Sequence, residues 1–134
     1  MKNAKDKLRC NCQITRIHLE KYFEETYNVT DAKKLTSQYY TLSKNLLKST
    51  EDVDVIIFDI SKYIVSADKS GNIEKSKELT ELFNVCVSYR KEIEHFFVGC
   101  ENALKSDGTS LYHSLRSAAD ILIRKISLLE TCLV

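Results

Sequence analysis

Residues 111–133, LYHSLRSAADILIRKISLLETCL, decide the fold class of this chain. Apolar residues follow one another there at intervals of 4, 3, 4, 4, 3 and 4 residues: Leu111, Leu115, Ala118, Leu122, Ile126, Leu129 and Leu133. Because an α-helix has about 3.6 residues per turn, this spacing places all of them on one face. The stretch therefore predicts an amphipathic helix that buries one side against other helices.

The same helical spacing recurs in four further stretches, at about 4–27, 31–48, 51–67 and 72–105. The chain contains no proline, the residue that breaks helices most strongly, and only three glycines: Gly71, Gly99 and Gly108. We therefore expect an all-α fold, an antiparallel helical bundle of four to five helices with short loops. Residues 1–134 are expected to form one domain.

Local signals mark the ends of these helices. Thr30 or Asp31 is expected to cap the second stretch, and Ser49 with Asp52 resembles a capping box that starts the third. Asp68–Asn72 is the clearest turn, and Ser106–Gly108 is a second stop, after which Thr109 or Ser110 can cap the last helix. Gly99 leaves open whether the 72–105 helix is continuous.

Three stretches, the first, the third and the fourth, carry apolar faces that are wider than a small bundle usually needs. In the third stretch, the helical period of Val53, Ile57, Ile60 and Ile64 favours helix over strand. Further apolar residues extend this face around most of the circumference: Val55, Phe58, Tyr63 and Val65. We expect this helix to be the most buried one. In the first stretch, Cys10, Ile14 and Ile17 similarly predict a broad buried face.

Composition narrows the classes of function. A net charge of +1 argues against a nucleic-acid binder that works by neutralising phosphates. No apolar run is long enough to span a bilayer, and no apolar segment of a secretory signal follows the charged N-terminus. The odd number of cysteines, five, cannot all pair within one chain. We therefore expect reduced thiols in an intracellular protein, cytoplasmic or nuclear.

No motif with specific chemistry is present. Cys10-x-Cys12 is half of a zinc pattern without a second pair of ligands, so buried thiols are the favoured interpretation. A glycine-rich phosphate loop and a serine nucleophile elbow are both missing from the sequence. We accordingly predict no catalytic residue, no cofactor and no metal.

Arg90 and His95 have the Arg-x-x-x-x-His spacing, which resembles the signature of HEPN domains, small helical bundles that include metal-independent ribonucleases. The resemblance implies an acid/base role for His95 and a phosphate-stabilising role for Arg90, usually across a dimer. The polar residue that often follows the arginine in that family is replaced by Lys91. In a regular helix the two side chains also point about 140° apart.

His113, in His113-Ser-Leu-Arg-Ser117, resembles the phosphorylated histidine of histidine-phosphotransfer domains. This resemblance implies that His113 accepts a phosphoryl group. Ser117 stands where that family has a glycine, and only 21 residues follow His113.

The favoured function is a non-enzymatic protein–protein interaction module, such as an adaptor, a complex subunit or a host-binding bundle. Tyr27, Tyr40 and Tyr112 are the candidate partner-binding residues, because tyrosine is enriched at interfaces. The partner is expected to be another protein bound through a helical surface. Association of two copies through the last helix is the homo-oligomeric alternative, and the ribonuclease and the phosphotransfer protein are the enzymatic ones.

Overall fold

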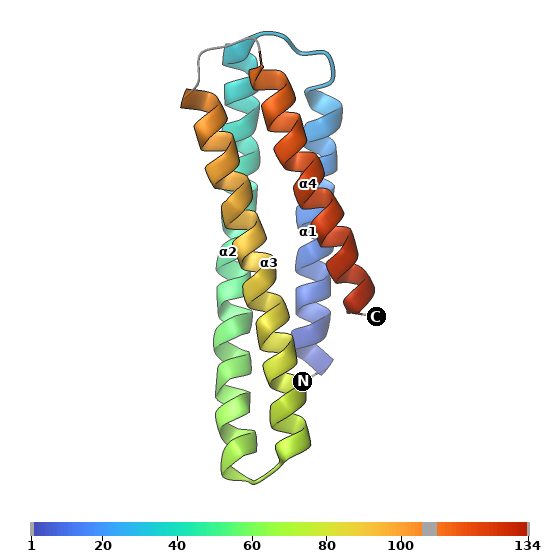
Figure 1. Ribbon diagram of the computed structural model, residues 1–134, viewed down its shortest axis with the longest axis vertical. Helices are drawn as coiled ribbons and strands as arrows, with labels where there is room; N and C mark the ends of the chain where they lie inside the picture. The colour runs from blue at the N-terminus through green and yellow to red at the C-terminus, as the bar shows by residue number, and fades with distance from the viewer. Residues whose placement is uncertain (1, 106–109, 134) are drawn as a thin grey trace.

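The computed structural model describes residues 2–105 and 110–133, which form four α-helices. They are α1 (Lys2–Glu25), α2 (Ala32–Lys69), α3 (Ile73–Lys105) and α4 (Leu111–Cys132). Each helix packs antiparallel to the next along the chain, and α4 returns to contact α1 (Figure 1). This confirms the predicted all-α antiparallel bundle with short loops.

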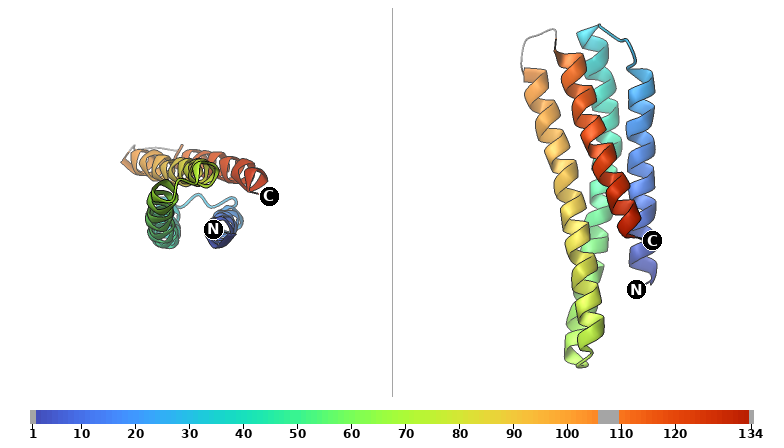
Figure 2. Two further views of the ribbon diagram at one scale, coloured as in Figure 1. Left: turned by 90° about the horizontal axis from the view of Figure 1, so that it is seen from below. Right: turned by 45° about the vertical axis from the view of Figure 1, so that its right-hand side comes forward.

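The four helices surround one apolar core. Seen along the bundle, α1 and α2 lie on one side and α3 and α4 on the other (Figure 2). Side chains with no exposed surface come from every helix: Leu8, Leu19, Leu46, Ile60, Cys86, Ile93, Leu115 and Ile126. Four of the seven apolar residues predicted on one face of the last helix are fully or almost fully buried, namely Leu115, Leu122, Ile126 and Leu133, so the core uses that face.

The helices differ in length, and this shapes one end of the molecule. With 38 and 33 residues, α2 and α3 are longer than α1 and α4, which have 24 and 22. The hairpin of α2 and α3 therefore extends past the start of α1 and the end of α4 (Figure 1). At its tip Gly71 has φ 73°, a left-handed conformation that suits glycine, which confirms the predicted turn at 68–72.

One predicted boundary is wrong: the stretches 31–48 and 51–67 form a single helix, α2. Ser49 and Thr50, expected at a new helix start, are buried in its middle. The Thr50 hydroxyl donates to the carbonyl of Leu47 at 2.7 Å, and the Ser49 carbonyl accepts from the Asn11 side-chain amide at 3.0 Å. The Thr50 hydroxyl is thus bonded within the helix and the Ser49 carbonyl is bonded by α1, so both residues belong to the interior of α2.

The remaining helix ends follow local chemistry. Asp31 is the N-cap of α2, and its side chain accepts from the backbone amide of Lys33 at 3.0 Å, as predicted. Asn28, just beyond α1, has φ 58° and ends that helix in a left-handed conformation. Ser110 precedes α4 without a side-chain capping bond, and the predicted stop at 106–108 and Thr109 lie outside the described residues.

Helix α3 is continuous through Gly99. A methyl group added at Gly99 would meet the Cβ atom of Ala118 on α4 at 4.0 Å, which is ordinary van der Waals contact. The glycine is therefore not required by packing, and it costs the helix conformational entropy.

We expect Gly99→Ala to raise the free energy of unfolding by about 0.5–1 kcal/mol, the difference in helix propensity. Urea unfolding followed by circular dichroism measures the change. Gly71→Ala is the matched control, and its positive φ should make the same substitution destabilising. Lower stability of Gly99→Ala would show that α3 and α4 need closer approach at this point.

Candidate functional site

Several large apolar side chains lie outside the core, on the outer faces of the helices. The prediction that 51–67 is the most buried helix is wrong for the residues that extend its apolar face. Those four residues are all exposed: Val55, Phe58, Tyr63 and Val65. Ile14 and Ile17 on α1 are exposed as well. Cys10 is also exposed, so the prediction of a buried thiol is confirmed for Cys12 and wrong for Cys10. Neighbouring helices cover only the part of each circumference that faces them, and these residues lie beyond that part.

Four of these exposed residues form a line along α2. Tyr40, Leu47, Phe58 and Val65 are 51%, 52%, 61% and 52% exposed. Their intervals of 7, 11 and 7 residues return to nearly the same angle, within about 20° of one line parallel to the axis. At about 1.5 Å per residue the line is roughly 37 Å long. We call these four residues the α2 seam.

The local sequence explains why the seam faces outward. The core face of α2 is set by residues at helical spacing: Leu35, Tyr39, Leu42, Leu46, Val53, Ile56 and Ile60. The seam lies roughly opposite this face, and α2 runs the full height of the bundle (Figure 1). Apolar residues repeated every 7 or 11 residues are typical of helices that pack lengthwise against another helix.

The middle of the seam is acidic. Glu51 and Asp54 lie between Leu47 and Phe58, one on either side of the line and about 30° from it. Asp54 binds Arg90 of α3, with Oδ1 2.5 Å from Nε and Oδ2 3.3 Å from Nη2. Arg90 also contacts Glu94, so one cation serves two carboxylates. The Glu51 carboxylate has no hydrogen-bond or ion-pair partner among the described residues.

A groove between α1 and α2 adjoins the seam. It encloses about 420 Å³, and its apolar wall includes Cys10, Ile14 and Val55. Val55 precedes Phe58 by three residues, so the two side chains are neighbours on the helix surface. The groove therefore widens the apolar surface from the seam toward α1.

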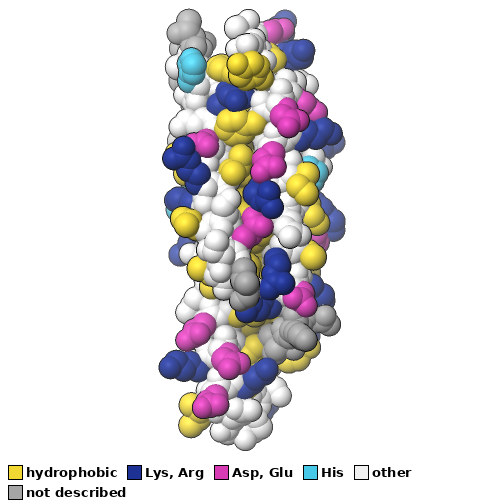
Figure 3. Space-filling model, turned by 90° about the vertical axis from the view of Figure 1, so that its right-hand side faces the viewer, with side chains coloured by type: hydrophobic (Ala, Val, Ile, Leu, Met, Phe, Trp, Pro, Cys, Tyr) yellow, Lys and Arg dark blue, Asp and Glu magenta, His cyan; other side chains and the backbone are white. Residues whose placement is uncertain are grey.

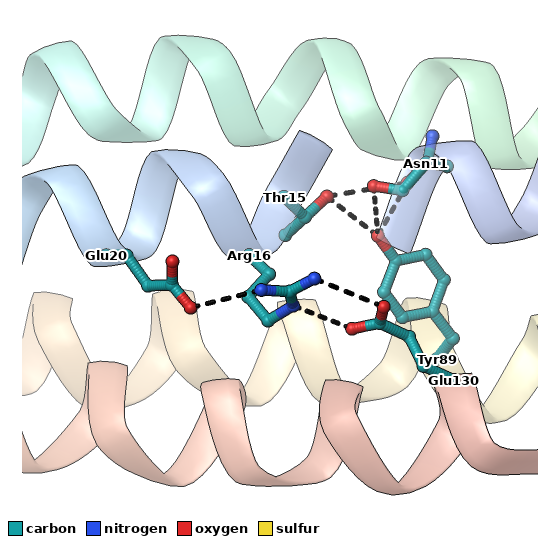
Figure 4. A network of polar contacts seen from close by, with 6 residues as sticks. All are labelled: Asn11, Thr15, Arg16, Glu20, Tyr89 and Glu130. Atoms are coloured by element: carbon teal, nitrogen blue, oxygen red, sulfur yellow. Dashed lines mark hydrogen bonds and ion pairs between the residues drawn. The ribbon is translucent and has the colours of Figure 1, made fainter. Parts of the chain in front are cut away.

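The side of the molecule seen in Figure 3 has a different character. Basic and acidic side chains alternate there over the whole height, with apolar side chains scattered among them. Arg16 of α1 pairs with Glu130 of α4, the Nε atom lying 2.8 Å from Oε1, and Arg16 also contacts Glu20 at 3.2 Å (Figure 4). The pair of Arg16 and Glu130 ties α1 to α4.

A polar cluster lies inside the core (Figure 4). The Tyr89 hydroxyl donates to Oδ1 of Asn11 at 2.5 Å, and its oxygen lies 2.7 Å from the Thr15 hydroxyl. Burial raises the pKa of Tyr89, and it raises the pKa of Cys12 to about 12. Both groups are thus protonated at neutral pH, which makes Cys12 a poor nucleophile and gives this cluster a structural role.

The three predicted tyrosines do not form one site. Tyr40 belongs to the α2 seam, whereas Tyr27 and Tyr112 lie around Arg116, with ring centroids 5.9 and 5.3 Å from its guanidinium carbon. Tyr112 is only half-exposed. Arg116 donates to the carbonyl of Phe23 at 2.7 Å, so this cluster holds the end of α1 against α4.

The residues of the two enzymatic resemblances lie apart from the seam. His95 is exposed, with Nδ1 3.9 Å from Glu92, and it shares an unbroken helix with Arg90, which binds carboxylates. Five residues of regular helix keep the two side chains about 140° apart, so one chain alone does not bring them together. His113 is exposed in the first turn of α4, where its ring packs edge-on to Tyr112.

The described part of the chain also lacks two other kinds of feature. Among residues 2–105 and 110–133 there is no group of three or more metal-ligating side chains, and no helix is both long and apolar enough to span a bilayer. None of the five cysteines, all of which lie in these ranges, forms a disulfide.

Sequence reasoning identified Tyr40 but missed Leu47, Phe58 and Val65 as surface residues. The signal was their mutual spacing, which keeps them off the stripe that contains Leu42 and Leu46.

No family model matches this chain, and comparison with curated proteins and with solved structures finds no significant match. The seam is therefore interpreted from its own geometry.

Proposed function

We propose that this protein is a helical protein–protein interaction module that binds its partner along the α2 seam. The observation that carries the proposal is the alignment of Tyr40, Leu47, Phe58 and Val65, each more than half exposed, on one long helix. Single exposed apolar residues are common on protein surfaces, but a row of four on one line offers a partner a continuous contact. Tyrosine and phenylalanine are also enriched at interfaces.

The length of the seam fits a helical partner. A helix that lies along α2 over roughly 37 Å would contact all four residues. Apolar residues repeated along the partner would pack between them, as in helix-in-groove and coiled-coil recognition. No catalytic group is needed for this function, and the buried thiols and phenols of the core serve stability.

The test compares variants of the tagged protein in affinity purification from cells that express it, with quantitative mass spectrometry of the eluates. We expect Phe58→Glu to deplete the bound partner by more than about tenfold, because a carboxylate buried in an apolar contact loses hydration without compensation. Circular dichroism and thermal unfolding of the variant should be unchanged, since the side chain is exposed.

Val98→Glu is the matched control. Val98 is 59% exposed, close to Phe58 at 61%, but it lies on α3 away from the seam. The proposal requires a partner that is lost with Phe58→Glu and retained with Val98→Glu. Equal recovery with both variants would contradict it.

A further inference from the structure

The seam residues are arranged symmetrically along α2. The intervals 7, 11 and 7 are the same in both directions, so an antiparallel second copy of α2 would place Tyr40 opposite Val65 and Leu47 opposite Phe58. A two-fold pair of this kind presents the same surface on both chains. Judged by the spacing of the apolar residues alone, the α2 seam would bind the α2 seam of another copy of this chain.

The charges oppose that pairing. The same two-fold axis would place Glu51 opposite Asp54 of the second copy, so four carboxylates would meet at the centre of the interface. Arg90 is already shared by Asp54 and Glu94. The nearest exposed lysine, Lys48, is already paired with Asp52 at 3.1 Å. Lys44 and Lys62 would face Ser61 and Ser43 of the second copy, so they do not correct this either. Like charges placed together in an interface disfavour that pairing strongly.

We infer that the α2 seam binds one helix of a different protein, whose apolar residues follow the 7, 11 and 7 spacing and whose centre carries lysine or arginine. The inference rests on the proposed function and specifies its partner. A basic residue at the centre of the partner helix would meet the Glu51 carboxylate, which lacks a partner among the described residues. It would also lie near Asp54 and Glu94, the two carboxylates that share Arg90. The apolar residues on either side would supply the contact area, and the central charges would select the partner.

The probe is a synthetic helix of about 28 residues with leucines at this spacing, two lysines between the middle leucines, and alanine and glutamine elsewhere. A second peptide carries glutamates in place of the two lysines. Fluorescence anisotropy measures the binding of both peptides to the full chain. We expect the lysine peptide to bind at least about tenfold more tightly at low salt, with the difference shrinking as salt is added.

Two protein variants make the test specific. Glu51→Lys should remove or invert the preference between the peptides, and Glu51→Gln should reduce it. Phe58→Glu should weaken the binding of both peptides, because it changes the apolar contact that they share. Glu51 is exposed, so circular dichroism should show the fold of its variants unchanged.

Three outcomes would overturn the inference: equal affinity for the two peptides, no binding of either, or a wild-type dimer in sedimentation equilibrium that Phe58→Glu dissociates. The last outcome would identify the occupant as a second copy. The purification experiment separates these from failure of the proposed function. If Phe58→Glu loses the partner and Glu51→Lys does not, the seam is still the binding surface. Only the inference that the partner helix is basic at its centre would then be wrong.

Discussion

Replacing Tyr89 with alanine should lower the free energy of unfolding by about 3–5 kcal/mol, the range for removing a fully buried aromatic ring. Tyr89 has no exposed surface and packs at the centre of the bundle. Its hydroxyl also bonds to Asn11 at 2.5 Å and lies 2.7 Å from Thr15, and both of those residues are buried on α1. The substitution leaves a cavity and two polar side chains without their main partner.

Urea unfolding of the wild type and of two variants separates the ring from the hydroxyl. Tyr89→Phe keeps the ring and should cost about 1–3 kcal/mol, the penalty for a buried group left without its hydrogen bond. Tyr63→Ala is the matched control, because Tyr63 is exposed on the same bundle, and its effect should stay within about 0.5 kcal/mol. A Tyr89→Phe variant as stable as the wild type would show that the hydroxyl contributes nothing to the core.

Much of the fold could be predicted because helix-breaking signals are few and clear. Asp31 and the turn at Gly71 end helices through local chemistry that the sequence displays. The continuity of α2 could not be predicted at Ser49 and Thr50. A serine and a threonine followed by acidic residues usually start a helix. Here the Ser49 carbonyl is bonded by Asn11, a contact between residues 38 positions apart.

The candidate site was less predictable, for a geometric reason. Apolar spacing shows how wide the apolar face of a helix is, but not how much of it the neighbours cover. Ile56 and Phe58 are both apolar and two residues apart, yet one is buried in the core and the other is on the seam. Their spacing from Leu42 and Leu46 separates them only once Ala32–Lys69 is known to be one continuous helix. Glu51 and Asp54 are likewise ordinary acidic residues in the sequence, and their place beside an apolar line depends on the continuity of α2.

Raising the pH should unfold the protein cooperatively between about pH 10 and 12, because three buried thiols and three buried phenols are held protonated. Burial raises the pKa values of Cys12, Cys86 and Cys100 from an ordinary 9.0 to about 12. It also raises the pKa values of Tyr22, Tyr39 and Tyr89. The unfolded chain therefore releases protons that the folded chain retains.

The sign and size follow from this difference in bound protons. Below about pH 9 the thiols are protonated in both states, so their contribution to stability is constant. Above it, each thiol that ionises only in the unfolded chain removes roughly 1.4 kcal/mol per pH unit, or about 4 kcal/mol for three. A domain with a typical stability of about 5–15 kcal/mol cannot withstand that loss as far as pH 12.

Denaturant unfolding at a series of pH values, with a phosphine reductant present, measures the slope of stability against pH. Cys86→Ala should reduce the slope between pH 9 and 10 by about one quarter, since one of three linked thiols is gone and the three phenols also begin to ionise in the unfolded chain at these pH values. Val53→Ala, which removes buried apolar volume without a titrating group, should lower stability at every pH and leave the slope unchanged. An unchanged slope in Cys86→Ala would mean that this thiol ionises as readily in the bundle as in the unfolded chain. Water would then have to reach a side chain that the packing of α3 against the core leaves with no exposed surface.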